Sequence, residues 1–179
     1  MCIRGWLFPF LLFLGLSAQA QFYAGSHPVS FYSKGTGGEM TLASKQMVSE
    51  YDATNRKLSI RMKTQGLTFE ANAETQQVLT EVFQVDAFPL WQMEADLSQA
   101  RPHPGGKGYL VPVVLLYHGM APVIADAHLF FRETTDAVHM DLALNFRLDQ
   151  LGIADPSVRF PKTANRWDLV VENARLMRR

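Results

Sequence analysis

Five histidines are the residues of this sequence best suited to metal binding or acid–base chemistry. They are His27, His103, His118, His128 and His139, and no two of them are spaced as His-x-His or His-x-x-x-His. Zinc ligands usually come in closely spaced pairs, so this scatter predicts no metal site. If they lie on adjacent strands, His128 and His139 could still face each other.

No motif for nucleophilic catalysis or phosphate binding accompanies these histidines. The Gly-x-Ser-x-Gly elbow is absent. The glycine-rich segment Lys34-Gly35-Thr36-Gly37-Gly38 does not match a P-loop and indicates a hairpin turn instead. Carboxylates such as Glu94, Asp96 and Asp141 fall at positions expected to face water. We therefore predict no catalytic residue, no cofactor and no enzymatic activity.

One histidine occupies a position that could serve a ligand. His118 follows the apolar run Tyr109–Tyr117 and precedes Gly119, a residue suited to a turn. Its side chain would then either contact a ligand head group at the mouth of a barrel or cap the end of a strand. Both interpretations stay open, and His118 is included among the candidate ligand-binding residues.

Composition and charge argue against nucleic acid as a partner. The 179 residues suffice for one domain with its own core, with 47% hydrophobic and 19% charged residues. Lysine plus arginine number 17 and aspartate plus glutamate number 17, so the formal net charge is zero. No basic stripe suited to a phosphate backbone is present, and nucleic acid is not an expected partner. A homodimer remains open.

Residues 1–20 have the layout of a secretory signal peptide. Arg4 precedes the apolar run Trp6–Leu16, and Ala18-Gln19-Ala20 offers small residues for cleavage after Ala20. The mature domain would then comprise residues 21–179, without Cys2, the single cysteine. No later run has the ~20 apolar residues of a spanning helix, so we predict a periplasmic or secreted protein without stable membrane insertion.

Alternation of apolar and polar residues dominates the chain after residue 20. The clearest case is Val138–Phe146, where every second residue is apolar, as in a strand with one wet face. The same pattern predicts strands at 58–62, 91–97, 123–131 and from 167 onward, with weaker ones around Val29 and Met40. Short, evenly spaced strands of this kind indicate a sandwich or a barrel.

Two segments depart from this alternation. Between Asn72 and Asp86 the apolar residues recur at spacings of three and four, which predicts one helix capped by Asn72 and packed over an open end or face of the sheet. Tyr109–Tyr117 is apolar on both faces, which predicts a strand covered on both sides. Pro112 within it indicates an edge or a bulge.

Four segments together resemble the YceI-like lipid- or polyisoprenoid-binding family. They are a strand over 58–70, the junction Asp86-Ala87-Phe88-Pro89, the strand and turn Val114–Val123 with His118-Gly119 and Pro122, and the piece Phe146–Ile153. Their order and spacing hold across nearly the whole mature chain. The resemblance implies a mainly β protein, an antiparallel lipocalin-like β-barrel of about eight strands with one appended α-helix. It also implies an elongated apolar cavity and an apolar lipid or isoprenoid ligand.

The inward-facing residues of such a barrel are the candidate ligand-binding residues. Besides His118 they are Phe31, Leu58, Ile60, Met62, Trp91, Met93, Val113, Leu115, Met140, Leu142, Leu144, Phe146, Trp167 and Leu169. The sequence departs from the family pattern at Gln77, where a histidine is common, and after Gly119, where a threonine and a basic residue are usual. These losses of polar and basic groups argue against a pyrophosphate-bearing ligand.

Two other functions compete with a lipid carrier. In the first, the barrel is packed solid and its surface recognises another envelope protein. In the second, histidines gathered at the barrel mouth form an enzyme site. A continuous hollow interior would favour the carrier, and a cluster of histidines with a carboxylate would favour the enzyme.

Overall fold

The computed structural model describes residues 21–69, 73–117 and 122–179. The predicted signal peptide, Asn72 and His118 lie outside these ranges. The strands are β1 (Phe22–Gly35), β2 (Gly38–Asp52), β3 (Lys57–Lys63), β4 (Leu67–Phe69), β5 (Leu90–Asp96), β6 (Arg101–Pro102), β7 (Tyr109–Leu116), β8 (Val123–Glu133), β9 (Ala137–Arg147) and β10 (Arg166–Arg178). The helical segments are α1 (Ala73–Gln77), a π-helical turn η2 (Val78–Val82), and the 3₁₀ turns η1 (Thr64–Gly66), η3 (Leu97–Gln99) and η4 (Asp149–Leu151).

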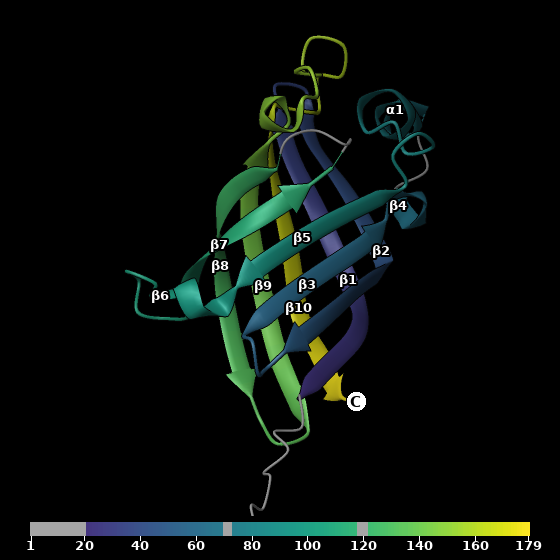
Figure 1. Ribbon diagram of the computed structural model, residues 1–179. Helices are drawn as coiled ribbons and strands as arrows, with labels where there is room; N and C mark the ends of the chain where they lie inside the picture. Colours follow the sequence, from purple (N-terminus) through teal and green to yellow (C-terminus); the bar gives the residue numbers. More distant parts are fainter. Residues whose placement is uncertain (1–20, 70–72, 118–121) are drawn as a thin grey trace, which may run out of the picture.

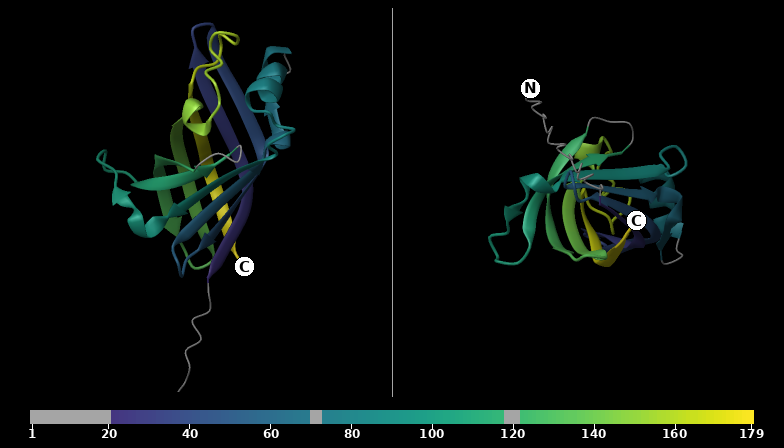
Figure 2. Two further views of the ribbon diagram at one scale, coloured as in Figure 1. Left: turned by 45° about the horizontal axis from the view of Figure 1, so that its top comes forward. Right: turned by 60° about the horizontal axis from the view of Figure 1, so that its bottom comes forward.

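Eight strands close into an antiparallel barrel (Figures 1 and 2). Their order is β1-β10-β9-β8-β7-β5-β3-β2, and the pairing of β2 with β1 completes the circle. The short strands β4 and β6 extend the sheet beside β2 and β7. The predicted mainly β, lipocalin-like barrel of about eight strands with an appended helix is therefore confirmed.

The alternation of apolar and polar residues predicted from the sequence determines which face of each strand points into the barrel. In β9, Val138, Met140, Leu142, Leu144 and Phe146 are buried, and the residues between them are exposed or half-buried. β3 and β5 show the same period of two. Because successive side chains of a strand point to opposite faces, the local sequence decides which residues line the interior.

A β-bulge changes this phase within β10. The buried residues run at odd positions to Val171 and then at even positions from Ala174, where the pairing with β9 shifts. Asn173 takes a positive φ of 53°, and its backbone N–H donates to the Asp141 carboxylate over 2.6 Å. The extra residue keeps apolar side chains facing inward along the whole strand.

For strand β7, the predicted irregularity at Pro112 is confirmed, but the predicted cover on both faces is not. Pro112 lies between the segment of β7 that pairs with β6 and the segment that pairs with β5. Neither β5 nor β6 pairs with Pro112, so the missing backbone N–H of this proline costs no hydrogen bond on that edge of β7, as expected for a proline at an irregularity. The outer residues Leu110, Val114 and Leu116 are only half-buried, so the predicted cover on both faces is wrong.

The helix is shorter than predicted. Instead of one helix over 72–86, α1 passes after Gln77 into the π-helical turn η2, where the Phe83 N–H donates to the Val78 carbonyl over 3.1 Å. The Thr80 hydroxyl donates to the Gln76 carbonyl over 3.0 Å, a contact that competes with regular helical bonding. Within the described ranges, no helix has the length and apolarity to cross a membrane.

The β1–β2 hairpin packs under the segment that follows η4, at the end of the barrel where α1 also lies (Figure 1). Gly35 and Gly37 donate their N–H groups to the carbonyls of Lys162 and Pro161 over 3.3 and 2.8 Å. A Cβ at Gly35 would lie 2.1 Å from the Pro161 carbonyl oxygen. This close backbone approach requires glycine.

Replacing Gly35 with alanine should therefore lower the free energy of unfolding by about 1–3 kcal/mol, because backbone atoms must move. Urea unfolding followed by circular dichroism measures the change. Gly66→Ala is the control, since its Cβ would meet the movable end of the Gln46 side chain at 3.0 Å. Equal losses in the two variants would contradict the assignment of strain to Gly35.

Candidate functional site

The inner surface of the barrel contains every predicted lining residue that the structure describes. All of these residues are buried and belong to one apolar cluster: Phe31, Leu58, Ile60, Met62, Trp91, Met93, Val113, Leu115, Met140, Leu142, Leu144, Phe146, Trp167 and Leu169. Their inward direction agrees with the sequence. Contact with a ligand stays a prediction for each of them.

Aromatic rings gather around Trp91 inside the barrel. The centroid of its ring lies 4.4 Å from that of Tyr117, 5.3 Å from that of Phe146 and 5.6 Å from that of Phe31. Phe83, which follows η2, joins them at 6.2 Å. Edge and tilted contacts of this kind add stability beyond the burial of the rings.

Phe83 connects the helical segment to this cluster. Its ring packs edge-on against Trp167, with 5.2 Å between the centroids, and its carbonyl accepts a hydrogen bond from the Tyr117 hydroxyl. Val78, Leu79 and Val82 of η2 are buried beside it. The apolar stripe of the predicted helix therefore faces the barrel core, as expected.

The interior carries almost no charge. Among the described residues, no lysine, arginine, aspartate or glutamate is buried. Several buried hydroxyls are hydrogen-bonded: Ser33 and Thr163 donate to the carbonyls of Arg166 and Phe160, and Ser44 accepts from the Gln46 N–H. An interior of this kind suits an uncharged molecule, because a buried ion needs a partner.

His27 and Ser49 form a polar pair on the inner surface. The two side chains come from the paired strands β1 and β2, and His27 Nε2 lies 2.7 Å from Ser49 Oγ. His27 is 5% exposed and Ser49 is fully buried. Burial lowers the pKa of His27, and the Pro28 backbone opposes this shift by less. The ring is therefore neutral at pH 7.

Sequence reasoning missed this pair, although it contains a usable signal. Odd-numbered residues from Tyr23 to Ser33 include Val29 and Phe31, so the period of two places His27 on the same face. The contact with Ser49 spans 22 residues and depends on the pairing register. As a base and a hydroxyl the two resemble part of a catalytic triad, but no buried carboxylate orients His27 among the described residues.

The other described histidines lie outside the barrel. His128 stacks against His103, with 4.3 Å between the ring centroids, and its Nε2 lies 2.8 Å from the Lys107 carbonyl oxygen. The suggested pairing of His128 with His139 is wrong, because the register places Ala143 opposite His128 and Arg132 opposite His139. Over the described ranges, no three His, Cys, Asp or Glu side chains are grouped to hold a metal ion.

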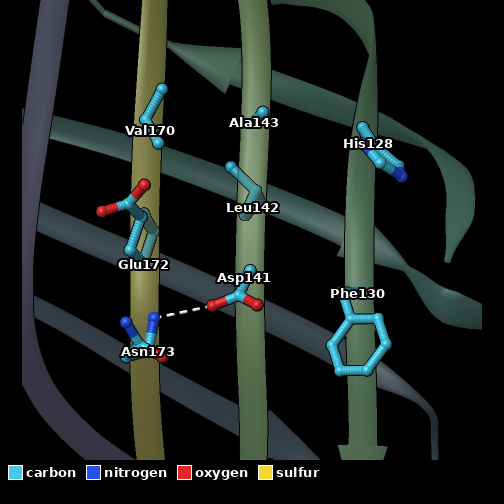
Figure 3. Close-up of a pocket in the computed structure, with 9 residues that line it drawn as sticks. His128, Phe130, Asp141, Leu142, Ala143, Val170, Glu172 and Asn173 are labelled. Atoms are coloured by element: carbon cyan, nitrogen blue, oxygen red, sulfur yellow. Dashed lines mark hydrogen bonds between the residues drawn. The ribbon is translucent and has the colours of Figure 1, made fainter. Parts of the chain in front are cut away.

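An open groove also lies on the outer face of β8, β9 and β10 (Figure 3). His128 and Phe130 form one side of it, and Glu172 and Asn173 form the other. The Asp141 carboxylate between them accepts the Asn173 N–H that holds the bulge. Because its polar contact is structural, we assign the candidate site to the barrel interior.

Solved structures of other proteins share this architecture. The structure of a polyisoprenoid binding domain from Saccharophagus degradans, implicated in plant cell wall breakdown, superimposes with a TM-score of 0.65 over 89% of this chain and 98% of that chain, at 9% identity. This chain has the fold of that polyisoprenoid binding domain. The predicted resemblance to the YceI-like family is thereby confirmed for the fold.

The crystal structure of Burkholderia cenocepacia BcnA shows the same architecture. It aligns with a TM-score of 0.61 at 15% identity, covering 83% of this chain and 94% of that chain. No family model and no curated protein matches the sequence. At these identities the comparisons show a shared fold, and the ligand has to be argued from the chain's own residues.

Proposed function

We propose that this protein is an exported, non-catalytic carrier that holds one apolar, isoprenoid-like molecule inside its barrel. The observation that carries the proposal is the inner surface, which is mostly apolar and holds no lysine, arginine, aspartate or glutamate among the described residues. An eight-stranded barrel can enclose one small ligand. Burial of a hydrocarbon tail would supply ~0.8 kcal/mol for each CH₂ group removed from water.

Two further observations support the proposal. The protein from Saccharophagus degradans with the same fold is described as a polyisoprenoid binding domain. The inner surface includes Met40, Met47, Met62, Met93 and Met140, whose flexible side chains adapt to irregular apolar shapes. The signal-peptide pattern of residues 1–20 supports export to the periplasm or the medium.

Native mass spectrometry tests ligand holding directly. We expect the purified protein to carry lipid that organic solvent removes, and to bind added farnesene, a hydrocarbon of isoprene units, with one molecule per chain. Entry of farnesene should also change the fluorescence of Trp91 and Trp167, which are both buried in the interior. Ligand-free protein that binds no added isoprenoid would overturn the proposal.

Adjacent valines of β7 provide a matched pair of variants. Val113 is buried and points inward, whereas Val114 is half-buried on the outer face. Val113→Phe should lower the affinity for farnesene at least about tenfold, because one extra aromatic side chain competes with the ligand for interior space, a loss of ~1.4 kcal/mol. Val114→Phe should leave the affinity unchanged. Equal effects of the two substitutions would place any ligand outside the barrel.

The aromatic cluster around Trp91 favours a second candidate, an exported interaction module with a solid core. Ring centroids in this cluster lie 4.4–6.2 Å apart, as in an ordinary packed core. In that case Val113→Phe would destabilise the barrel without changing any ligand occupancy. The same mass spectra therefore separate the two functions.

A further inference from the structure

Two buried nitrogen atoms on the inner surface lack a well-formed hydrogen bond. Among the described residues, His27 Nδ1 and Trp91 Nε1 are the buried side-chain nitrogens that make no hydrogen bond of ordinary geometry, although the Pro28 backbone acts on His27 and the Tyr117 side chain interacts with Trp91. Both side chains are at least 95% buried and lie on inward-facing positions of β1 and β5. Buried polar groups are normally satisfied, so one without a well-formed hydrogen bond inside a ligand-binding barrel is a place where a ligand's polar group is expected.

The pairing register places these two residues in one row across four strands. His27 lies opposite Met47, Met47 opposite Met62, and Met62 opposite Trp91. Neighbouring strands are about 4.8 Å apart, so the row spans roughly 14 Å along the wall. Its middle consists of two methionine side chains, which suit contact with a flexible hydrocarbon.

His27 sits where β1 is irregular. The register with β2 shifts between His27 and Val29, and the register with β10 shifts between Ala24 and Ser30. No β10 residue is paired with His27, since the β1–β10 register is interrupted between Ala24 and Ser30. Ser49, its partner on β2, is fully buried and has a short side chain.

The chemistry of the pair selects the polar group that would bind there. If Nε2 accepts a hydrogen bond from the Ser49 hydroxyl, Nδ1 carries a hydrogen and donates; with the other tautomer, Nδ1 accepts. A hydroxyl group can both accept and donate, so it satisfies His27 in either tautomer. A phosphate or carboxylate would need a buried cation, and no lysine or arginine is buried among the described residues.

We propose that His27, held by Ser49, anchors the hydroxyl group of a neutral long-chain alcohol whose hydrocarbon chain lies across Met47 and Met62. This inference rests on the proposed carrier function and names the polar end of its ligand. His27 would contact the ligand directly, and Ser49 would position the imidazole. A pyrophosphate ester of the same chain would be rejected.

The test compares three probes with the same fifteen-carbon skeleton: farnesol, farnesene and farnesyl diphosphate. Dissociation constants are measured for the wild type and for His27→Leu by the fluorescence of Trp91 and Trp167. The ratio of farnesol affinity to farnesene affinity should fall at least about tenfold in His27→Leu, a change of ~1.4 kcal/mol. Using the ratio removes the general loss or gain of apolar contacts in the variant. The wild type should bind farnesol more tightly than farnesyl diphosphate.

Serine variants of β2 supply the positioning test and its control. Ser49→Ala should lower the same ratio by a smaller factor, because the imidazole remains but loses its partner. Ser44→Ala removes another fully buried hydroxyl of β2, one that accepts from the Gln46 N–H, and should leave the ratio unchanged. If His27→Leu does not fold, as judged by circular dichroism, this serine pair decides the question.

The outcomes separate this inference from the proposed function. If farnesene binds but the ratio does not change in the His27 or Ser49 variants, the carrier stands and the anchor is wrong. Farnesyl diphosphate binding as tightly as farnesol would also overturn the anchor. If none of the three probes binds to the wild type, the carrier function itself fails.

Discussion

Replacing Trp167 with alanine is expected to lower the free energy of unfolding by about 3–5 kcal/mol. The Trp167 side chain is fully buried, and its ring packs edge-on against Phe83. Its indole N–H also donates to the Ala164 carbonyl over 3.0 Å. The substitution leaves a large cavity and an unpaired carbonyl, and it loosens the attachment of the helical segment to the barrel. Urea unfolding, followed by circular dichroism, measures the loss.

Phenylalanine substitutions at the two buried tryptophans separate packing from hydrogen bonding. Trp91 is also buried, but its indole nitrogen makes no hydrogen bond of ordinary geometry and interacts only with the neighbouring Tyr117 side chain among the described residues. Trp167→Phe should therefore cost more than Trp91→Phe, by about 1–3 kcal/mol for the stranded carbonyl. The opposite order would show that packing around Trp91 matters more than the Ala164 contact.

Leu142→Lys is expected to prevent folding at 25 °C. Leu142 lies near the middle of β9, points into the barrel and is 2% exposed. The variant loses about 2–5 kcal/mol of leucine packing. It must also bury an amine in an interior without a carboxylate partner among the described residues. The sum approaches the whole stability of a domain of this size.

Ala143→Lys is the matched control one residue along β9. Its side chain points outward beside Val170, in the groove that also contains Asp141 and Glu172. A lysine there stays in water near two carboxylates, so we expect a change within about 0.5 kcal/mol. Circular dichroism and the elution volume in gel filtration would show the contrast. A folded Leu142→Lys variant together with an unfolded Ala143→Lys variant would reverse the assigned inner and outer faces.

These expected outcomes all depend on closure of the barrel around an apolar interior. The interior is apolar because every strand turns its apolar face to the same side, and closure of the sheet brings these faces together. His27 is the one buried residue with an ionisable acid–base group among the described buried polar residues, and such a group inside an apolar core requires a reason. The proposed binding of an alcohol group by His27 is such a reason, and the ratio of farnesol affinity to farnesene affinity tests it.

Much of the lining could be predicted from the sequence, because side-chain direction in a strand is a local property. The period of two in Val138–Phe146 identifies the inward residues of β9 without any knowledge of its neighbours. The turn at Gly35–Gly38 is equally local, since a hairpin requires residues that tolerate its backbone angles. The ordered segments that resemble the YceI-like family add the closed barrel, which alternation alone does not distinguish from a sandwich.

Tertiary structure alone decided the features that depend on register. The bulge at Asn173 changes the phase of β10 through a hydrogen bond to Asp141, a residue of the neighbouring strand. The helix predicted over 72–86 passes into the π-helical turn η2, and Phe83 after this turn packs against Trp167. Such contacts join distant segments, so no local pattern carries them. The sequence by itself determined which faces are apolar; only the closed barrel determined that His27 meets Ser49, because that contact depends on how β1 and β2 pair.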